Sequence, residues 1–374
     1  MISTVELDLK VIDNDFCVNC GACEGMCPYW HSLHGRMMHE YECCREDGRC
    51  VGFCPRMPTD LEALRDKFFA ANTVLDGLGP FRGLFLTRAA DSSIRCGSQH
   101  GGTVTALLEL AIKEGFIDAA VTAKSSGGLS PQSVLAVSAE DIRSCRGSSF
   151  QIPATLAVLN AALKEERYKK IGVVGTPCKT LAVYKMMSKP LPDRDNNADN
   201  IGMVFGLFCG WGLDWTGLET LVGRFAKPDG VSHIDIPPSK FHCMTIDGEC
   251  GKTEVNLDDV TPLVRKNCRF CTDLTAEFAD ISVGGARSGD GWEVDKGWNQ
   301  TIVRTEKGAA LLELARIKGV LEFREVPEFN LERLKKASVG KKRTGVGNIV
   351  SLTGDPGNLQ YLTPSVGMFA GLMD

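Results

Sequence analysis

Eight of the 16 cysteines lie between Cys17 and Cys54, and this crowding limits the possible folds more than any other feature of the sequence. The first four follow the spacing C-x2-C-x2-C-x3-C and are followed by Pro28. In bacterial iron–sulfur proteins with this spacing, three thiolates bind one cluster and the fourth binds the neighbouring cluster. Disulfides are the alternative, but a chain of 374 residues whose N-terminus has no apolar leader favours metal ligation in a reducing compartment.

The second half of this ferredoxin-like module is less regular. It has aspartate at position 47, where regular spacing back from Cys54 would require cysteine. We expect Cys54 to complete the first four-iron cluster, together with Cys17, Cys20 and Cys23. A second cluster would be held by Cys27, Cys44 and Cys50, with Cys43 or Asp47 as its fourth ligand. A three-iron cluster, or a spectator role for Cys43 or Cys44, is also compatible with this spacing.

After the cysteine-rich module, segments typical of strands and helices alternate. Residues 83–90 and 117–123 have the character of strands, and residues 103–114 have the apolar period of a helix. Residues 171–187 are typical of a strand, a glycine turn and a helix, and residues 201–212 of a strand and a turn. This alternation predicts an α/β (α+β) domain built on a mixed sheet, with ligand sites at the strand ends.

These patterns divide the chain into three parts. We expect a small bacterial-ferredoxin-like domain over residues 1–75, an α/β domain over residues 76–325 and a C-terminal extension over residues 326–374. Residues 76–82 are typical of a linker, and the glycine-rich basic run at residues 340–348 of a flexible surface loop. Binding of an anionic group by that run is the alternative.

Four further cysteines lie at predicted strand ends or in a close pair. Cys178 and Cys209 each follow a predicted strand, and Cys268 and Cys271 have the spacing C-x2-C. Four thiols meet the ligand count of a zinc site and of a four-iron cluster, and the neighbouring iron–sulfur module favours the cluster. The remaining thiols are expected to be buried or spectator groups, with a redox role as the alternative: Cys96, Cys145, Cys243 and Cys250, the last two in a predicted strand-turn-strand.

A glycine loop at residues 97–102 precedes the predicted helix at residues 103–114. A helix N-terminus offers free N–H groups and a partial positive charge, which suit a phosphate group. The loop lacks the spacing G-x-G-x-x-G, so a simple turn is the alternative. We interpret it as a candidate site for a nucleotide pyrophosphate.

Three motifs together resemble those of the family of coenzyme F420-reducing hydrogenase beta subunits. They are Gly101-Gly102-Thr-Val-Thr-Ala-Leu-Leu, Gly175-Thr-Pro-Cys178 and Cys268-Arg-Phe-Cys271-Thr-Asp-Leu-Thr-Ala-Glu277-Phe-Ala-Asp280-Ile-Ser-Val-Gly284. The resemblance covers about residues 80–325, together with the fused ferredoxin module. It implies that the α/β domain is flavin-binding, with FAD beside a [4Fe–4S] cluster, so that the chain would hold about three [4Fe–4S] clusters.

The resemblance also implies site residues. The ligands of the third cluster would be Cys178, Cys209, Cys268 and Cys271. The flavin contacts would be Gly101, Gly102, Thr103, Gly147, Ser148 and Ser149. His100 would contact the flavin or the hydride carrier, or be a solvated loop residue. We expect the acidic residues near the C-x2-C pair to cap and hydrogen-bond the turn: Asp273, Glu277 and Asp280.

The function that the resemblance implies is electron transfer between coenzyme F420, as the co-substrate that exchanges a hydride with FAD, and the clusters. The partner would be a catalytic subunit of a hydrogenase, formate dehydrogenase or heterodisulfide reductase type of complex. No catalytic side chain is expected, because the flavin takes the hydride itself. The alternatives are an FAD and iron–sulfur reductase that uses NAD(P)H, ferredoxin or an organic substrate, and an electron-transfer adaptor without a substrate of its own.

Charge and hydropathy argue against two further classes of protein, those that bind nucleic acid and those that span a membrane. The formal net charge of -5 and a pI near 5.8 do not favour a nucleic-acid-binding face. No stretch of the sequence reaches the ~18 uninterrupted apolar residues of a membrane helix. We therefore expect a cytoplasmic oxidoreductase without a membrane span or a nucleic-acid partner.

Overall fold

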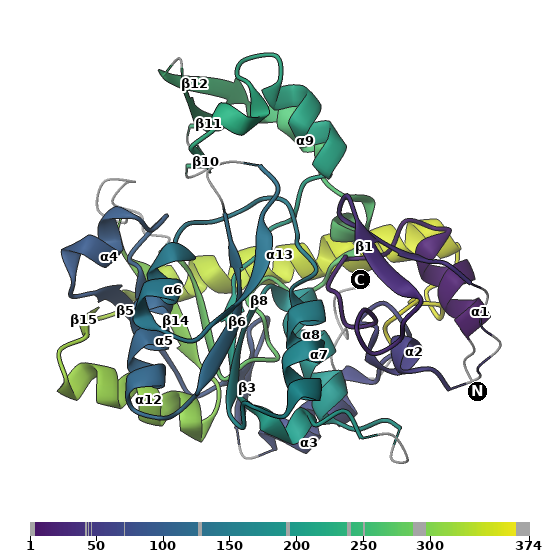
Figure 1. The fold of residues 1–374 in the computed structure, drawn as a ribbon, viewed down its shortest axis with the longest axis horizontal. Helices are drawn as coiled ribbons and strands as arrows, with labels where there is room; N and C mark the ends of the chain where they lie inside the picture. Colours follow the sequence, from purple (N-terminus) through teal and green to yellow (C-terminus); the bar gives the residue numbers. More distant parts are fainter. Residues whose placement is uncertain are drawn as a thin grey trace.

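The computed structural model describes residues 4–41, 43, 45, 47–70, 72–125, 129–191, 195–237, 241–249, 251–286 and 297–363. Its centre is an eight-stranded sheet of order β15-β5-β14-β13-β9-β8-β6-β7 (Figure 1). Strands β6, β8, β9 and β13 pair in parallel, and antiparallel strands complete both edges. The predicted mixed sheet is therefore confirmed. Its strands are β5 (Gly83–Ala89), β6 (Ala119–Lys124), β7 (Gln132–Ala136), β8 (Ile171–Gly175), β9 (Ile201–Leu207), β13 (Ile281–Gly285), β14 (Asn299–Val303) and β15 (Leu321–Arg324).

Helices cover both faces of the sheet. In β9, Met203 and Phe205 pack with α5 and α12, whereas Val204 packs with α7 and α8. Successive side chains of a strand point to opposite faces, so the two helix pairs form separate layers. The major helices are α5 (Thr103–Lys113), α7 (Thr155–Glu165), α8 (Pro177–Met187) and α12 (Glu306–Ile317), with α4 (Ser92–Cys96) and α6 (Ala139–Ser144) as shorter ones.

A smaller three-stranded sheet lies beside the main one, at the top of Figure 1. It has its own apolar cluster, in which Met244 and Ile246 pack with Leu218 and Leu221. The predicted strand-turn-strand is confirmed within it. Its elements are β10 (His233–Asp235), β11 (Cys243–Gly248), β12 (Gly251–Asn256), α9 (Trp215–Val222) and α10 (Leu257–Val260).

The N-terminal module shares its core with the α/β part. Val18 and Phe53 belong to the same buried cluster as Leu156 and Leu159 of α7. Asn160 of the same helix is fully buried and donates to three backbone carbonyls of the module, those of Gly21, Ala22 and Glu24. The elements of the module are α1 (Thr4–Leu7), a π-helical turn (Asp8–Ile12), β1 (Trp30–Leu33), β2 (Arg36–His39) and α2 (Arg49–Phe53), followed by α3 (Leu61–Phe69).

Gly21 shows why a glycine is needed at this junction. Its φ is +85°, and an added Cβ would lie 2.7 Å from the Ala154 carbonyl oxygen. The neighbour that crowds this glycine is the start of α7. The backbone of the module therefore approaches α7 as closely as a glycine permits.

Two sequence predictions are wrong. The predicted linker at residues 76–82 lies in a hairpin formed by β3 (Thr73–Leu75) and β4 (Gly79–Phe81), and Leu78 at its turn is fully buried. The predicted surface loop at residues 340–348 lies within the 26-residue helix α13 (Glu328–Thr353). Each interior glycine costs a helix about 1 kcal/mol relative to alanine. Packing of α13 on the rest of the protein offsets this cost, because its side chains Leu334, Val346 and Ile349 are buried.

Helix α13 crosses the molecule toward the N-terminal module, as the yellow helix in Figure 1. The segment after it pairs with the module, where Thr59 N–H donates to the Tyr361 carbonyl and Thr363 N–H to the Thr59 carbonyl. Among the described residues, none of the helices combines the length and the apolar character needed to cross a membrane.

Candidate functional site

The four thiols predicted to hold the first cluster lie together. Burial raises the pKa of Cys20 well above its ordinary value, and the Cys54 and Cys17 thiolates raise it further. The pKa of Cys23 is raised in the same way, first by burial and then by Cys20, Cys17 and Cys54. Cys17, Cys23 and Cys54 also pack against one buried apolar cluster. The loop after the π-helical turn and the end of α2 thus bring these four sulfurs to one place.

The backbone donates hydrogen bonds to two sulfurs of this set and to one sulfur of the predicted third set. Asn19 N–H donates to Cys17 Sγ over 3.4 Å, and Arg56 N–H donates to Cys54 Sγ over 3.4 Å. Gly212 N–H donates to Cys268 Sγ over 3.3 Å. Such bonds favour the thiolate form, which is the form that binds iron.

The second predicted cluster is described in part. Burial raises the pKa of Cys50 to about 11, and the Cys27 thiolate adds to this rise, so the two thiols are neighbours. Cys43 lies in the adjoining loop, where its carbonyl accepts from the Thr4 hydroxyl. Cys44 lies outside the described residues, and the choice between Cys43 and Asp47 as the fourth ligand stays a prediction.

The third set of thiols is brought together by the sheet. Cys178 lies in the first turn of α8, directly after β8, and Cys209 follows the adjacent parallel strand β9. Cys268 is the middle residue of a short 3-10 helix (Lys266–Phe270), and Cys271 is its C-cap. Burial raises the pKa of Cys209, and the thiolates that add to the rise are Cys268, Cys178 and Cys271, while Lys341 opposes it. The structure therefore groups the four thiols that the sequence analysis proposed.

The first and third sets adjoin each other. Cys178 contributes to the raised pKa of Cys20, after burial and nearer groups. Lys179 is near thiols of both sets: burial lowers its pKa to about 8, against the effect of the Cys178, Cys20 and Cys209 thiolates. Its ammonium donates to Thr155 Oγ1 over 2.5 Å. The first set, in the N-terminal module, and the third set, at the strand ends of the sheet, are therefore near each other.

The donor set fits iron–sulfur clusters. Each iron of a four-iron cluster takes one cysteine sulfur, and the first and third sets each supply four. Arg56 also has a buried Nε atom without a hydrogen-bond partner among the described residues, and it lies near the third set. In the part of the chain that the structure describes, no three His, Cys, Asp or Glu side chains form a group suited to a single metal ion.

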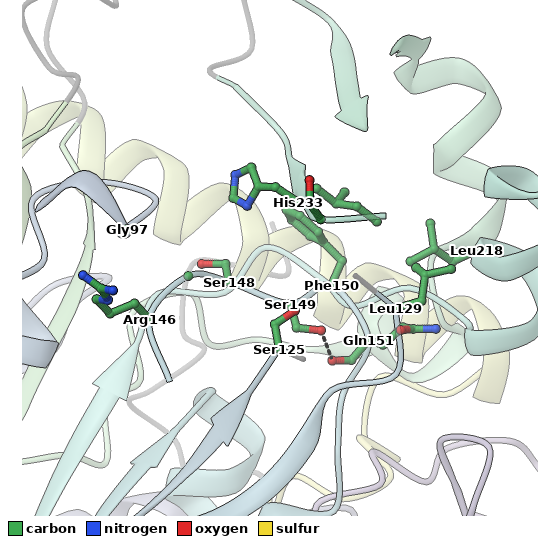
Figure 2. Close-up of a pocket in the computed structure, with 13 residues that line it drawn as sticks. Gly97, Ser125, Leu129, Arg146, Ser148, Ser149, Phe150, Gln151, Leu218 and His233 are labelled. Atoms are coloured by element: carbon green, nitrogen blue, oxygen red, sulfur yellow. Dashed lines mark hydrogen bonds between the residues drawn. The ribbon is translucent and has the colours of Figure 1, made fainter. Parts of the chain in front are cut away.

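A cavity of about 160 Å³ lies near the loop that follows α6 (Figure 2). Its walls include the predicted flavin contacts Gly147, Ser148 and Ser149, with His233 of β10 opposite them. The Ser148 hydroxyl donates to Gln99 Oε1, and Gln99 Nε2 donates to Asp235 Oδ1 over 2.6 Å. Gly147 has a φ of +96°, and no described heavy atom lies within 4 Å of an added Cβ. This loop is polar and accessible.

The cavity adjoins the third set of thiols. The Phe150 carbonyl, next to Ser149, accepts from Leu213 N–H over 2.7 Å. The preceding residue, Gly212, is the one whose N–H donates to Cys268 Sγ. One backbone segment thus connects the cavity wall to a predicted cluster ligand.

The glycine loop before α5 has a different environment. The cavity, as the described residues define it, is not lined by Gly101, Gly102 or Thr103. Thr103 is buried, and its N–H donates to Asn299 Oδ1 over 3.3 Å. Its hydroxyl lies 2.9 Å from Thr87 Oγ1. A flavin contact at these three residues stays a prediction.

The other predicted site residues pack against, hydrogen-bond or pair with neighbouring groups of the protein itself. His100 is half-buried against Gly285, and burial lowers its pKa, with Asp235 opposing that effect. The Asp273 carboxylate accepts from the N–H groups of Thr275 and Glu277, and Asp280 accepts from Val204 N–H and the Thr305 hydroxyl. The expected hydrogen bonding within the turn is confirmed for Asp273, whereas Asp280 binds β9 and the residue before α12 instead. Glu277 differs, because it forms a buried ion pair with Lys342 of α13.

The remaining thiols are dispersed. Cys96 is exposed at the end of α4, Cys145 Sγ donates to the Asp141 carbonyl over 3.2 Å, and Cys243 begins β11. Cys250 lies outside the described residues. The spectator role expected for these four thiols, with a redox role as the alternative, stays a prediction.

Comparison with known proteins gives matches along most of the chain. Residues 84–160 match the family model described as coenzyme F420 hydrogenase/dehydrogenase, beta subunit N-term, and residues 168–328 match the C terminus of the same family. Residues 10–29 match a 4Fe-4S binding domain. The family resemblance and the N-terminal iron–sulfur module are thereby confirmed.

Relatives with assigned names support the same grouping. The chain is 30% identical to the coenzyme F420 hydrogenase subunit beta of Methanococcus voltae, over 73% of this chain and 95% of that protein. It is 28% identical to an F(420)H(2) dehydrogenase subunit of Methanosarcina mazei, over 90% of this chain and 92% of that protein. A chain of the F420-reducing [NiFe] hydrogenase complex from Methanosarcina barkeri superposes with a TM-score of 0.64 at 27% identity, over 74% of this chain and 94% of that chain.

Proposed function

Since the chain belongs to the family of coenzyme F420 hydrogenase/dehydrogenase beta subunits, we propose that it is an oxidoreductase subunit that transfers electrons between coenzyme F420 and a series of [4Fe–4S] clusters. FAD, bound at the cavity, would mediate this transfer. A flavin supplies the chemistry that the clusters lack, because it exchanges two electrons with a hydride carrier and single electrons with iron–sulfur centres.

The observation that carries this proposal is the proximity of the third and first thiol sets. Cys178 and Cys20 are electrostatic neighbours, and the cavity wall connects through Gly212 to Cys268. The cavity, the third thiol set and the N-terminal module thus follow one another in space. That order suits a path for single electrons, in which the N-terminal clusters would be the exit toward a partner.

The residues around the cavity suit a flavin nucleotide. Ser148 and Ser149 offer hydroxyl groups, and Gly147 leaves its backbone accessible to a ligand. The cavity of about 160 Å³ is smaller than the roughly 300–1,000 Å³ of typical ligand pockets. These residues would therefore hold one portion of the FAD. Gly101, Gly102 and Thr103 remain the proposed contacts for another portion.

The relatives named as hydrogenase and dehydrogenase subunits support a role within a larger complex. We assign the partner as the catalytic redox subunit of a hydrogenase, a formate dehydrogenase or a heterodisulfide reductase type of complex. The acidic side chains near the C-x2-C pair hydrogen-bond the backbone or form a buried ion pair. The role of the protein would therefore be to hold the cofactors in order.

Anaerobic reduction of the purified chain tests this function. We expect reduced F420 to bleach the flavin and iron–sulfur absorbance together, whereas NADH and NADPH leave both unchanged over the same time. Bleaching by NADH or NADPH instead would move the chain to the NAD(P)H-linked alternative. A chain that holds flavin and clusters but reacts with none of the three donors would favour the adaptor alternative.

A further inference from the structure

Helix α13 contacts the residues that carry the third thiol set. The match to the family model ends at residue 328, where this helix begins. The Lys341 ammonium donates to the Cys209 carbonyl over 2.5 Å. One turn later, an added Cβ at Gly345 would lie 2.8 Å from the Cys271 carbonyl oxygen. The helix therefore packs directly on two of the four predicted ligands.

Further contacts fix this helix on the loop that carries Cys268 and Cys271. Asn348 Nδ2 donates to the Arg269 carbonyl over 2.7 Å, and Lys342 Nζ donates to the Thr272 carbonyl over 3.1 Å. With the helix held on both sides of the pair, the Lys341 ammonium has a defined position beside the thiols. A lysine amine is ordinarily protonated at neutral pH, so Lys341 brings a positive charge to this place.

A second cation reaches the same thiols from the N-terminal module. Arg56 is 6% exposed and donates through Nη2 to the Asn267 carbonyl over 2.8 Å. Its guanidinium lies 4.3 Å from the centre of the Tyr361 ring. Arg56 lines one pocket together with Cys178 and Cys271, and a guanidinium keeps its charge in proteins. Two fixed positive charges from the flanks of the family domain therefore face one thiol set.

We propose that Lys341 and Arg56 are positioning residues that raise the reduction potential of the third cluster. The proposal rests on the proposed function, because it requires a cluster at these thiols. Reduction adds one electron, and hence one negative charge, to a cluster that four thiolates already make anionic. A cation held nearby in a poorly solvated site attracts the added charge more strongly than the same cation would in water. The C-terminal helix and the N-terminal module thus tune electron transfer out of the flavin.

A redox titration of the anaerobically purified full chain, followed by EPR, tests this role. Lys341→Met keeps the length of the side chain and removes its charge. We expect the equilibrium constant for reduction of the third cluster to fall on the order of tenfold, which is about 59 mV for a one-electron couple. Lys341→Arg keeps the charge and should restore a potential near the wild-type value. Arg56→Gln should shift the potential in the same negative direction as Lys341→Met.

Arg343 provides a matched control, because it lies on the exposed face of the same helix. Arg343→Met removes one positive charge and should leave the potential unchanged. Equal potentials in wild type and in Lys341→Met, at equal iron content, would overturn the proposal, as would an equal shift in Arg343→Met. If Lys341→Met loses iron, Lys341→Gln, which keeps a polar group there, replaces it in the same titration.

Failure of the underlying cluster assignment has a separate signature. The EPR signal of the third cluster is the one that Cys271→Ala should abolish. If Cys271→Ala keeps the wild-type iron content and all EPR signals, the assignment of the third cluster fails, whatever the Lys341 variants show. If Cys271→Ala loses that signal while Lys341→Met leaves its potential unchanged, only the role of the cations fails.

Discussion

Replacing Cys178 by alanine should leave the flavin reducible by its hydride donor but stop electrons from reaching the N-terminal clusters. Cys178 is the proposed ligand of the third set that packs against the buried cluster containing Cys20 of the first set. Changes to groups that only surround a metal ligand already cost about 10–100-fold in metal affinity or activity, so loss of a ligand should cost at least as much. Without the third cluster, the path between the cavity and the N-terminal module is interrupted.

The measurement is anaerobic reduction by F420H2 with the flavin and the clusters followed separately. In Cys178→Ala, the flavin band should bleach while the N-terminal cluster signals stay oxidised, and dithionite should still reduce those clusters. Cys96→Ala is the control, because this thiol is exposed and lies outside all three sets. Wild-type rates of cluster reduction in Cys178→Ala would show that electrons bypass the third set.

Replacing Lys342 by methionine should lower the free energy of unfolding far more than replacing a lysine of an exposed ion pair. Lys342 and Glu277 form an ion pair whose side chains are 6% and 3% exposed. Burial opposes ionisation of Glu277, but Lys342 holds the pKa of this carboxyl below its ordinary value. Breaking such a pair by removing one partner costs about 3–5 kcal/mol, because the remaining charge is buried without compensation. Arg65, whose Nη2 lies 3.8 Å from the Glu277 carboxylate, would offset only part of this cost.

Denaturant unfolding under anaerobic conditions measures this effect. The unfolding midpoint should fall clearly in Lys342→Met and recover most of the loss in the double variant Lys342→Met/Glu277→Gln. Lys335→Met is the control, because Lys335 pairs with the exposed Glu332 on the same helix and such pairs contribute about 0–1 kcal/mol. Equal midpoints in the two single variants would mean that the buried pair is not needed for folding.

Local patterns were sufficient to predict the sheet and the grouping of the thiols. Strand periodicity placed Cys178 and Cys209 at strand ends, and parallel pairing of β8 and β9 then makes those ends adjacent. The C-x2-C-x2-C-x3-C spacing likewise predicts close thiols without any knowledge of the fold. These features depend on residues close in sequence or on the general geometry of α/β sheets.

The wrong predictions and the missed residues depend on contacts between distant segments. The glycines of residues 340–348 disfavour a helix locally, and only packing against the Cys268–Cys271 loop explains why Gly345 is helical. Leu78 is buried because the hairpin that holds it packs on Leu274 and Ile302, which a linker composition does not reveal. Arg56 and Lys341 lie 285 positions apart in the sequence, so no local signal could place both beside one thiol set.

The predicted flavin contacts also depend on segments that are distant in sequence. Gly147, Ser148 and Ser149 line the cavity, but Thr103 is hydrogen-bonded within the protein by Thr87 and Asn299. A glycine loop before a helix is a general phosphate-binding feature, and its use depends on which side chains already occupy the helix N-terminus.

The proposed function requires one chain to hold a flavin and three four-iron clusters in series. Counting iron, acid-labile sulfide, zinc and flavin in the anaerobically purified chain is the most direct test of this requirement. We expect one FAD and about twelve iron atoms per chain, with matching sulfide and no stoichiometric zinc. About four or eight iron atoms with one zinc, or full iron without any flavin, would contradict it.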